Sequence, residues 1–510
     1  MWTRLVGGIG AAILVVVLVV AGVVAYAYSS ADVNTAGKVE FSHALQIPPI
    51  AESTVTPDGT RVFDLEMRQG IADLGHGPET ETWGVNGDYL GPTIRMTRGE
   101  PVRMNVRNEL GEASTLHWHG MHLPAAMDGG PHQMVEPDAT WSPDWVVDQP
   151  AATLWYHPHL HGSTAEHVYR GLAGMMIVDD PAGAALPDRY GVDDIPLIVQ
   201  DKTFDGDQLN LDPPIFSDTG ILGDEILVNG TPAPYLDVTT ERVRLRLLNA
   251  SNARVYDFGF DTGLPFDLIG TDGGLIEAPQ KLESIMLSPG ERAEIVVEIP
   301  PGTDAVLRST PPDLGADFMT ERFAGGADTL DVLELRAAET LEPNTEIPHR
   351  LAEKKDLGEP ERTRKFELNG SRSINGKEMD MSRIDEVVTL GTTEVWEVRN
   401  VSGEIHNFHV HDVQFQVLDT DNPALSGPKD TVYVPPGEAV RLLVRFTDYA
   451  DPSFPYMYHC HMLLHEDQGM MGQFVIVDKG EKPDVRVQAA ALYFEQKAHS
   501  NHGGQVIDAS

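Results

Sequence analysis

The chain has 510 residues, enough for about three domains of ordinary size. Its 78 acidic and 37 basic side chains give a formal net charge of -41, which argues against nucleic acid and anionic membrane surfaces as partners because the field would repel them. We interpret the acidic excess as a solvated surface that favours solubility. The single cysteine, Cys460, excludes an intrachain disulfide and points to chemistry instead.

The N-terminus begins with a long apolar segment. Arg4 is the only charged residue before residues 5–28, and the first acid is Asp32. A run of more than about 18 apolar residues is long enough to span a bilayer, and Arg4 would stay inside. Ala25-Tyr26-Ala27 is similar to a signal-peptidase site. We predict that residues 1–31 are a signal peptide or a membrane anchor. The rest would then be extracellular, in the cell envelope, or membrane-anchored and facing outward.

From about residue 45 onward the pattern is typical of β-strands. Runs such as 102–106 and 243–247 alternate apolar and polar residues, and Gly, Pro, Asp and Asn interrupt the chain about every ten residues. Few stretches have helical periodicity. The pattern therefore predicts an all-β fold built from sandwiches or Greek-key barrels.

Two internal repeats divide the chain. Asn108 is followed nine residues later by His117, and Asn400 likewise by His409, whereas nine residues after Asn249 stands Phe258. The middle copy thus keeps the spacing of the repeat but lacks the histidines. The segments 155–159 and 457–461 form a second repeat. We predict three similar β-domains at 45–182, 183–345 and 360–480, a polar linker near 343–364, and a C-terminal tail at 481–510.

Histidines occur in four His-x-His pairs. In a strand, residues i and i+2 face the same way, so each pair presents two imidazoles from one face. One such pair is weak evidence for a metal site, but four pairs, two in the first copy and two in the third, are strong evidence. Eight neutral imidazoles between two domains would bind a cluster of borderline-soft metals. The pairs are His117 and His119, His157 and His159, His409 and His411, and His459 and His461.

Cys460 indicates which metal is bound. It lies between His459 and His461, so its sulfur points to the opposite face and belongs to a different site. Together with His406, His465 and Met470 it completes a His2Cys set with a thioether, which is the ligand set of a blue-copper electron-transfer centre. Zinc would accept the histidines and the cysteine but does not need the methionine. Taken alone, Met470 would be read as core filling.

The motifs resemble those of multicopper oxidases. The matching segments are His117-Trp118-His119-Gly120, Trp155-Tyr156-His157-Pro158-His159, His406-Asn407-Phe408-His409-Val410-His411, and His459-Cys460-His461 through Met470. The segment 374–381 is similar to one shared by bacterial laccase-like and cuprous oxidases. The resemblance covers nearly all of the predicted exported chain and implies three cupredoxin-like Greek-key β-barrel domains.

The resemblance implies four copper ions per chain and a role for each ligand. His406, Cys460, His465 and Met470 hold the type 1 copper, His117 and His409 hold the type 2 copper, and His119, His157, His159, His411, His459 and His461 hold the type 3 pair. Pro158 stands where the third domain has Cys460, so the first domain should carry no blue copper. His161 either supports a ligand or is exposed, and we expect His122 and His132 to be exposed.

The resemblance also implies a mechanism. A substrate would give an electron near the exposed edge of the type 1 site, through His465, and the electron would cross the Cys460 backbone. Four such transfers, with four protons, reduce dioxygen to water. In the family an acid lies near the cluster at the positions of Asp128 and Glu466, which makes both candidates for proton delivery. The simpler alternatives are a turn aspartate and an ordinary surface glutamate.

The reducing substrate stays open at this point. Cuprous oxidases of the family often carry a methionine-rich insertion, and the 17 methionines here form no such run. Met379, Asp380, Met381 and Glu404 could form a small cation site, although the two methionines alternate and could equally pack in a core. Phenols, aromatic amines, bilirubin-like pigments, Cu(I) and Mn(II) are all compatible. Dioxygen and a small reductant are the expected partners of a monomeric chain that binds no nucleic acid.

A function of another class is a copper-binding cupredoxin scaffold or a copper-tolerance protein without oxidase turnover, because a fold does not fix a function. Relatives of that kind lose histidines or the cysteine. All twelve implied ligands are present here. The sequence therefore favours an enzyme, a laccase-like multicopper oxidase or cuprous oxidase.

Overall fold

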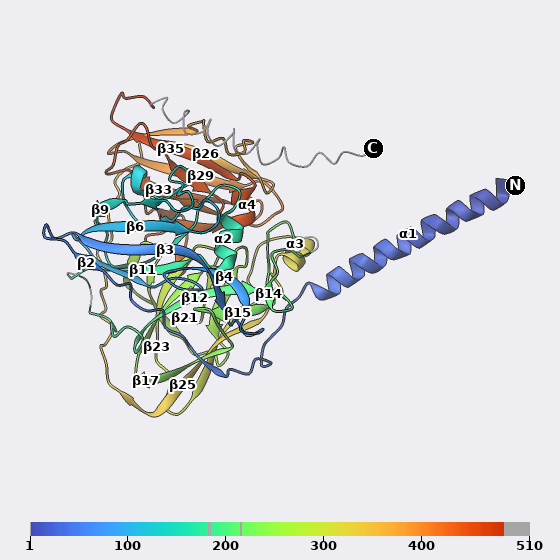
Figure 1. The fold of residues 1–510 in the computed structure, drawn as a ribbon, viewed down its shortest axis with the longest axis horizontal. Coiled ribbons are helices and arrows are strands. Elements are labelled where there is room, and N and C mark those ends of the chain that lie inside the picture. Colours follow the sequence, from blue (N-terminus) through green and yellow to red (C-terminus); the bar gives the residue numbers. More distant parts are fainter. Residues whose placement is uncertain (1, 182, 184, 215–216, 484–510) are drawn as a thin grey trace.

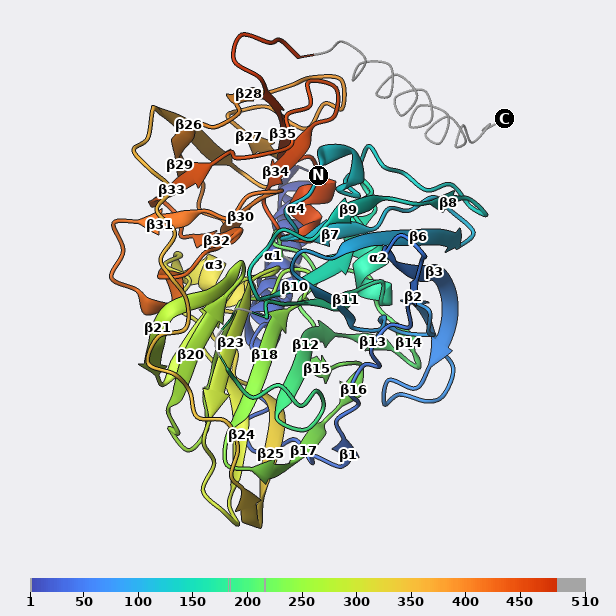
Figure 2. The ribbon, with the colours of Figure 1, turned by 90° about the vertical axis from the view of Figure 1, so that its left-hand side faces the viewer.

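The computed structural model describes residues 2–181, 183, 185–214 and 217–483, with the backbone alone for residues 2–13 and 30. Most of the predicted tail at 481–510 therefore lies outside the described residues. Most of the regular secondary structure in the described chain is β-strand, which confirms the predicted all-β fold. Figure 2 shows its three parts, with the second domain in green and yellow below the first in blue and the third in orange and red.

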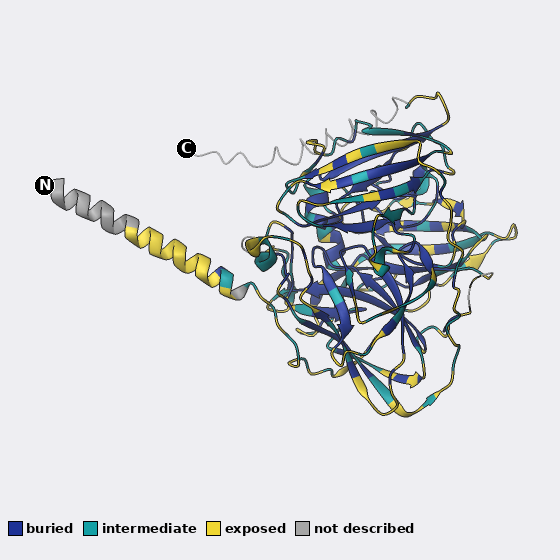
Figure 3. Ribbon diagram, turned by 180° about the vertical axis from the view of Figure 1, so that it is seen from behind, coloured by how far each residue is buried: buried dark blue, intermediate teal, exposed yellow. Residues whose placement is uncertain are grey.

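Helix α1 (Trp2–Ser30) stands away from this body (Figure 1). Most of its described side chains face solvent, as the yellow segment of Figure 3 shows, and Leu14, Val16 and Leu18 are 59%, 60% and 62% exposed, whereas Ala27 near its end is buried. Over the described residues, no helix combines the length and the apolar character that a membrane crossing requires. Residues 5–13 of the predicted apolar segment lie outside the part whose side chains are described.

The first domain packs two sheets face to face. One contains β2 (Thr54–Val55), β3 (Arg61–Ala72), β4 (Thr80–Val85), β6 (Pro101–Glu109), β8 (Thr140–Trp141) and β9 (Asp144–Val146). The other contains β5 (Ile94–Thr97), β7 (His117–His119), β10 (Ala152–His157) and β11 (Gly174–Asp179), with η1 (Ala125–Met127) and α2 (Thr164–Arg170) in the connections. The alternation predicted at 102–106 is observed, since Val102, Met104 and Val106 are buried and Arg103 is exposed.

The third domain repeats this arrangement. One sheet contains β26 (Arg362–Asn369), β27 (Ser373–Ile374), β29 (Thr393–Asn400), β31 (Gln416–Leu418) and β33 (Ala439–Arg445). The other contains β28 (Glu386–Thr389), β30 (His406–Val410), β32 (Thr431–Val434), β34 (Tyr456–His459) and β35 (Met471–Val477), with η2 (Pro423–Leu425) and α4 (Leu463–Asp467). β26 pairs with β29 in parallel, just as β3 pairs with β6.

The second domain has the same plan. One sheet contains β12 (Asp194–Lys202), β15 (Glu225–Val228), β16 (Thr231–Pro232), β18 (Val243–Asn249), β20 (Phe266–Thr271), β21 (Gly274–Leu282) and β23 (Arg292–Val297). The other contains β1 (His43–Ala44), β17 (Pro234–Thr240), β19 (Tyr256–Phe260), β22 (Ser284–Leu287), β24 (Asp304–Thr310) and β25 (Leu330–Glu342). The hairpin β13 (Phe204–Asp205) and β14 (Gln208–Leu209) and helix α3 (Phe318–Phe323) lie outside these sheets.

Two details of the second domain differ from or extend the sequence analysis. Phe258 and Phe260, which replace the histidine pair, are buried in the domain core. The alternating run 243–247 is not half-exposed, because Arg244 and Arg246 are also buried. Their guanidinium groups pair with Asp194 and Glu294 inside the molecule.

Buried apolar side chains form one large cluster in each domain. A smaller cluster, which includes Trp155, Met175, Ile198 and Leu248, joins the first domain to the second. Residues 343–361 contain no helix or strand and lead to the third domain. The domain limits 45–182, 183–345 and 360–480 stay a prediction.

A buried lysine of the second domain forms a hydrogen bond to the first domain. Lys202, at the end of β12, donates to the carbonyl oxygen of Tyr169 at 2.7 Å and lies 4.0 Å from the centre of that ring. Burial lowers the pKa of Lys202 to about 7. The unfolded chain therefore binds this proton up to a pH of about 10.5, whereas the folded chain releases it near pH 7.

We predict that the wild-type protein gains stability relative to Lys202→Met as the pH rises from about 7 to about 10. The slope should approach about 1.4 kcal/mol per pH unit, because a group with a lowered folded pKa disfavours folding most where it is protonated in both states. Thermal unfolding of both proteins over this range measures the difference. Parallel pH profiles would show that Lys202 keeps its proton in the folded state.

Candidate metal centre

Strand pairing brings the histidines together in two domains. In the first domain β7 lies beside β10, with His117 opposite His157 and His119 opposite Trp155. In the third domain β30 lies beside β34, with His409 opposite His459. The predicted His-x-His pairs therefore come from neighbouring strands at corresponding places in the repeated fold.

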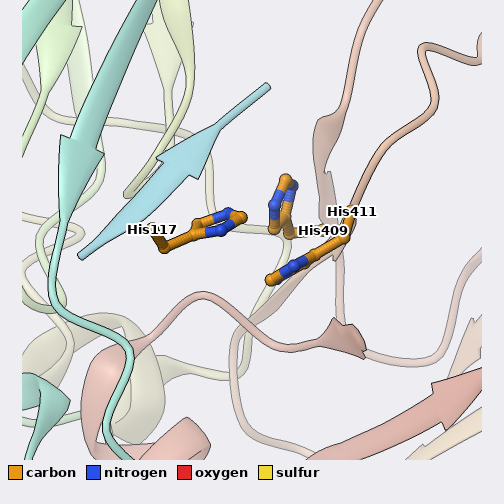
Figure 4. Close-up of side chains that lie close together, drawn as sticks. All are labelled: His117, His409 and His411. Carbon is orange, nitrogen blue, oxygen red and sulfur yellow. The ribbon is translucent and has the colours of Figure 1, made fainter. Parts of the chain in front are cut away.

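The two groups of histidines face each other across the boundary between the domains. The ring of His117 stacks on His411 with a centroid distance of 4.0 Å, and His119 stacks on His409 at 3.8 Å. Figure 4 shows His117 from the first domain pointing at His409 and His411 from the third. All eight paired histidines are buried.

Their nitrogens form three groups within metal-binding distance, two of which share His411. These groups are His117, His409 and His411; His119, His157 and His461; and His159, His411 and His459. In the group of His159, His411 and His459 the Nε2 atoms form a triangle with sides of 3.1, 3.2 and 3.3 Å. The centre of such a triangle lies about 1.9 Å from each nitrogen, close to the length of about 2.0 Å that imidazole–metal bonds have.

Hydrogen bonds from the other ring nitrogen orient several of these imidazoles. Nδ1 of His117 lies 2.8 Å from the carbonyl oxygen of Asp128, Nδ1 of His157 lies 2.7 Å from that of Pro158, and Nδ1 of His409 lies 2.9 Å from that of Asp430. Because a carbonyl can only accept, it holds the ring proton on Nδ1 and leaves Nε2 free to bind a metal. The Nε2 atoms of these three histidines are indeed buried without a hydrogen-bond partner in the described structure.

Metal binding requires neutral imidazoles, and burial favours the neutral form of seven of these rings. Burial lowers the pKa of His117, His119, His157, His409 and His411 well below the ordinary value. Burial also lowers the pKa of His159 to about 4 and that of His461 to about 3. Buried, unpartnered nitrogens on neutral rings fit a cluster of metal ions.

A second candidate site contains the cysteine. Cys460 Sγ lies 3.6 Å from Nδ1 of His406 and 3.6 Å from Nδ1 of His465, and these nitrogens are 3.2 Å apart. The centre of this triangle is about 2.0 Å from each atom, again near metal–ligand bond lengths. Met470 is buried beside them, and its carbonyl oxygen accepts from the backbone nitrogen of Cys460.

The surroundings of this site differ from the cluster. Cys460 and Met470 belong to the apolar core of the third domain, on the opposite side of the strand from His459 and His461. Burial raises the pKa of the Cys460 thiol to about 12. The thiol therefore keeps its proton until a cation replaces it.

One expectation about this site was wrong. His465 does not form an exposed edge, since it is fully buried and its Nε2 lies 2.9 Å from the carbonyl oxygen of Asp218. Asp218 itself is exposed. Asp218 of the second domain thus contacts the histidine, which no pattern around His465 could indicate.

Both predicted acids lie beside the cluster. Asp128 Oδ2 is 2.7 Å from Nδ1 of His411, and the carboxylate is buried. Burial and, to a lesser extent, Asp412 raise the pKa of Asp128 well above its ordinary value. A turn residue without contacts would not be placed in this way.

Glu466 is fully buried and is not a surface glutamate. Its Oε1 lies 3.1 Å from Nδ1 of His159, and its Oε2 lies 3.2 Å from Nδ1 of His459. Burial raises its pKa, but His159 and His459 outweigh that effect and hold the pKa well below the ordinary value.

The other histidines differ from one another. His161 is exposed. His122 and His132, which we expected to be exposed, are partly buried. Nδ1 of His122 lies 2.7 Å from Asp412, and Nε2 of His132 lies 2.8 Å from Oε1 of Gln473. The pairing partners are distant in sequence and carry no signal of their own.

The suggested cation site at Met379, Asp380, Met381 and Glu404 stays a prediction. Asp380 accepts from Ser382, and Met381 is buried. Burial of Met381 is compatible with the alternative in which the two methionines pack in a core.

Family models described as multicopper oxidase match residues 66–183, 193–305 and 346–480. The multicopper oxidase mco of Staphylococcus haemolyticus is 34% identical over 84% of this chain and 92% of that protein. The cell division protein FtsP of Escherichia coli (strain K12) is 36% identical over 85% and 92%.

Solved structures of the same family are also similar to this chain. A laccase from Pediococcus acidilactici Pa5930 matches with a TM-score of 0.78 and 35% identity, over 86% of this chain and 94% of that one. A multicopper oxidase from Campylobacter jejuni, described as a metallo-oxidase, matches with a TM-score of 0.76 and 27% identity, over 88% and 98%. These neighbours have three cupredoxin-like domains, which confirms the predicted fold class.

Proposed function

Because the chain belongs to the multicopper oxidase family and is a laccase-like oxidoreductase, we propose that it couples one-electron oxidation of a small reducing substrate to the reduction of dioxygen to water. The observation that supports this most is the convergence of eight buried imidazoles between two domains, next to a separate His2Cys site. Bound copper would supply the change of oxidation state that no side chain can provide.

The chain would hold four copper ions. His406, Cys460, His465 and Met470 would hold the type 1 ion, His117 and His409 the type 2 ion, and the other six histidines of the pairs the type 3 ions. The nearest groups of nitrogens favour a division of the type 3 ligands into His119, His157 and His461 for one ion and His159, His411 and His459 for the other. The Cys460 backbone is the direct covalent link between the two sites.

Asp128 and Glu466 would supply protons to the oxygen-reducing site. Asp128 contacts His411 and has a raised pKa, so it can hold a proton in the buried site. Glu466 lies between His159 and His459 and is ionised, so it would accept protons and help to fix those two rings.

The substrate would approach the type 1 site over Asp218. The exposed Asp218 touches His465, and Glu404, whose Oε2 atom is buried without a partner, lies close enough to Asp218 to feel its charge. An acidic approach favours cationic or neutral reductants over anions. Aromatic amines, phenols and Cu(I) all fit this requirement.

The alternative is a cupredoxin scaffold with no oxidase turnover. The similarity to cell division proteins FtsP keeps this alternative in view. The complete set of buried donor atoms favours the enzyme, because neutral unpartnered imidazoles are costly to bury unless a ligand satisfies them.

Oxygen uptake by one copper-loaded sample, measured with Cu(I), a phenol and a synthetic dye, tests the function. We expect four coppers per chain by metal analysis and oxygen consumption with at least one reductant. Cys460→Ser should remove the visible thiolate band and stop turnover while the cluster keeps its copper, because no cluster ligand changes. A blue wild-type protein that consumes no oxygen would establish the scaffold instead.

Asp128→Asn should slow reoxidation of the reduced enzyme by about 100-fold without loss of copper, since an amide still accepts from His411 but holds no transferable proton. Asp128→Glu is the matched control and should recover much of the rate. Stopped-flow mixing with dioxygen and metal analysis measure the two effects. Equal rates for wild type and Asp128→Asn would reduce Asp128 to a hydrogen-bond acceptor.

We also propose that the protein is exported through residues 1–31, because Arg4 precedes a long apolar run without a twin arginine. An unfolded chain has no preformed site, so copper would enter outside the cytoplasm. Fractionation of cells that express the full chain or residues 32–510 tests this. Metal-loaded full-length enzyme in the cytoplasm would contradict it.

A further inference from the structure

The second domain supplies none of the proposed ligands, yet one of its side chains reaches the cluster. Arg292, the first residue of β23, is completely buried. A guanidinium group so far from water needs partners for its donors, because it cannot lose its charge. The partners of Arg292 lie in all three domains.

Both terminal nitrogens of Arg292 bind Asp430 of the third domain. Nη1 and Nη2 donate to the two carboxylate oxygens, each at 2.7 Å, in the bidentate geometry that gives strong and directional ion pairs. The carbonyl oxygen of the same aspartate lies 2.9 Å from Nδ1 of His409. Thr431 also links the two, with its hydroxyl 2.9 Å from Asp430 and 3.1 Å from His409.

In the first domain Arg292 contacts both histidine-bearing strands. Nη1 lies 3.3 Å from Nδ1 of His119 on β7, and Nε donates at 3.0 Å to the carbonyl oxygen of Thr153 on β10, the strand that ends at His157. Gly120 packs closely against this ion pair. A Cβ atom at Gly120 would lie 2.6 Å from Nη2 of Arg292 and 2.6 Å from the Asp430 carboxylate.

Arg292 belongs to a charge network of the second and third domains that contains two cations and three carboxylates. Asp272 accepts from the backbone nitrogen of Arg292 at 2.8 Å and pairs with Lys429 at 3.0 Å. Lys429 in turn pairs with Glu291 at 2.9 Å. Because every one of these charges is buried, the network can hold the guanidinium in only one place.

We infer that Arg292 is a positioning residue for the oxygen-reducing cluster, and that it sets the distance between His119 of the first domain and His409 of the third. It also places a permanent positive charge behind these two stacked imidazoles. This role rests on the proposed function. The domain without ligands is thus part of the metal centre and more than a spacer.

The test compares Arg292→Lys, Arg292→Gln and a matched control, Arg254→Lys. Arg254 is an equally buried arginine of the second domain that pairs with Asp201 and Asp328, away from the histidines. Each protein is loaded with copper and dialysed against a graded chelator. The type 1 band is then read in visible spectra, and the cluster in electron paramagnetic resonance and near-ultraviolet spectra.

Both Arg292 variants should lose cluster copper at about 10–100-fold lower chelator concentration, with the type 1 band unchanged, as expected for a group that orients ligands from behind. Lysine at position 292 keeps the positive charge but lacks the bidentate geometry of the guanidinium group, so Arg292→Lys should retain more cluster copper than Arg292→Gln. The control Arg254→Lys should resemble wild type. The inference is overturned if the Arg292 variants hold cluster copper like the control, or if the type 1 band is lost in parallel. Wild-type protein without the four coppers would instead remove the proposed function.

Discussion

The whole centre depends on the alternation of side chains along one extended segment. In His459-Cys460-His461 the two imidazoles face the first domain, and the sulfur between them faces the core of the third domain. One stretch of backbone therefore belongs to two sites with different surroundings. A helix would spread three consecutive residues around its axis, so this arrangement requires extended backbone. β34 leads into it and ends at His459, where β30 and β35 fix its register on both sides.

The cluster depends equally on how the domains are docked. Each group of nitrogens mixes donors from the first and third domains, so neither domain has a complete site alone. The backbone carbonyls of Asp128, Pro158 and Asp430 fix ring orientation before any cation arrives. The second domain completes this assembly from behind, where Arg292 joins Asp430 to His119. Preorganisation is thus distributed over three domains, although the donor atoms come from two.

The sequence predicted the features that periodicity and spacing record. The strands, the repeat, the Phe258 substitution in the middle copy and the clustering of the His-x-His pairs follow from alternation along a chain. Family membership and an oxidase role are confirmed, whereas the ligand assignments and domain limits stay predictions. Long-range packing was beyond reach. The contact of Asp218 with His465, the pairing of Arg246 with Asp194 and the pairing of Arg292 with Asp430 join residues 247, 52 and 138 positions apart, and such polar residues resemble any others on a surface.

The segment 343–361 connects the second domain to the third and has no helix or strand. The chain runs from the first domain through the second to the third, and the facing histidines of the third and first domains complete a circuit. Metal ions bound by the histidines of both domains would join the first and third domains reversibly. The peptide chain already joins these two domains permanently, through the second domain. The three domains would then form a closed ring. Loss of the ions would not by itself release the third domain, because the buried ion pairs of Arg292 with Asp430 and of Lys429 with Glu291 still join it to the second.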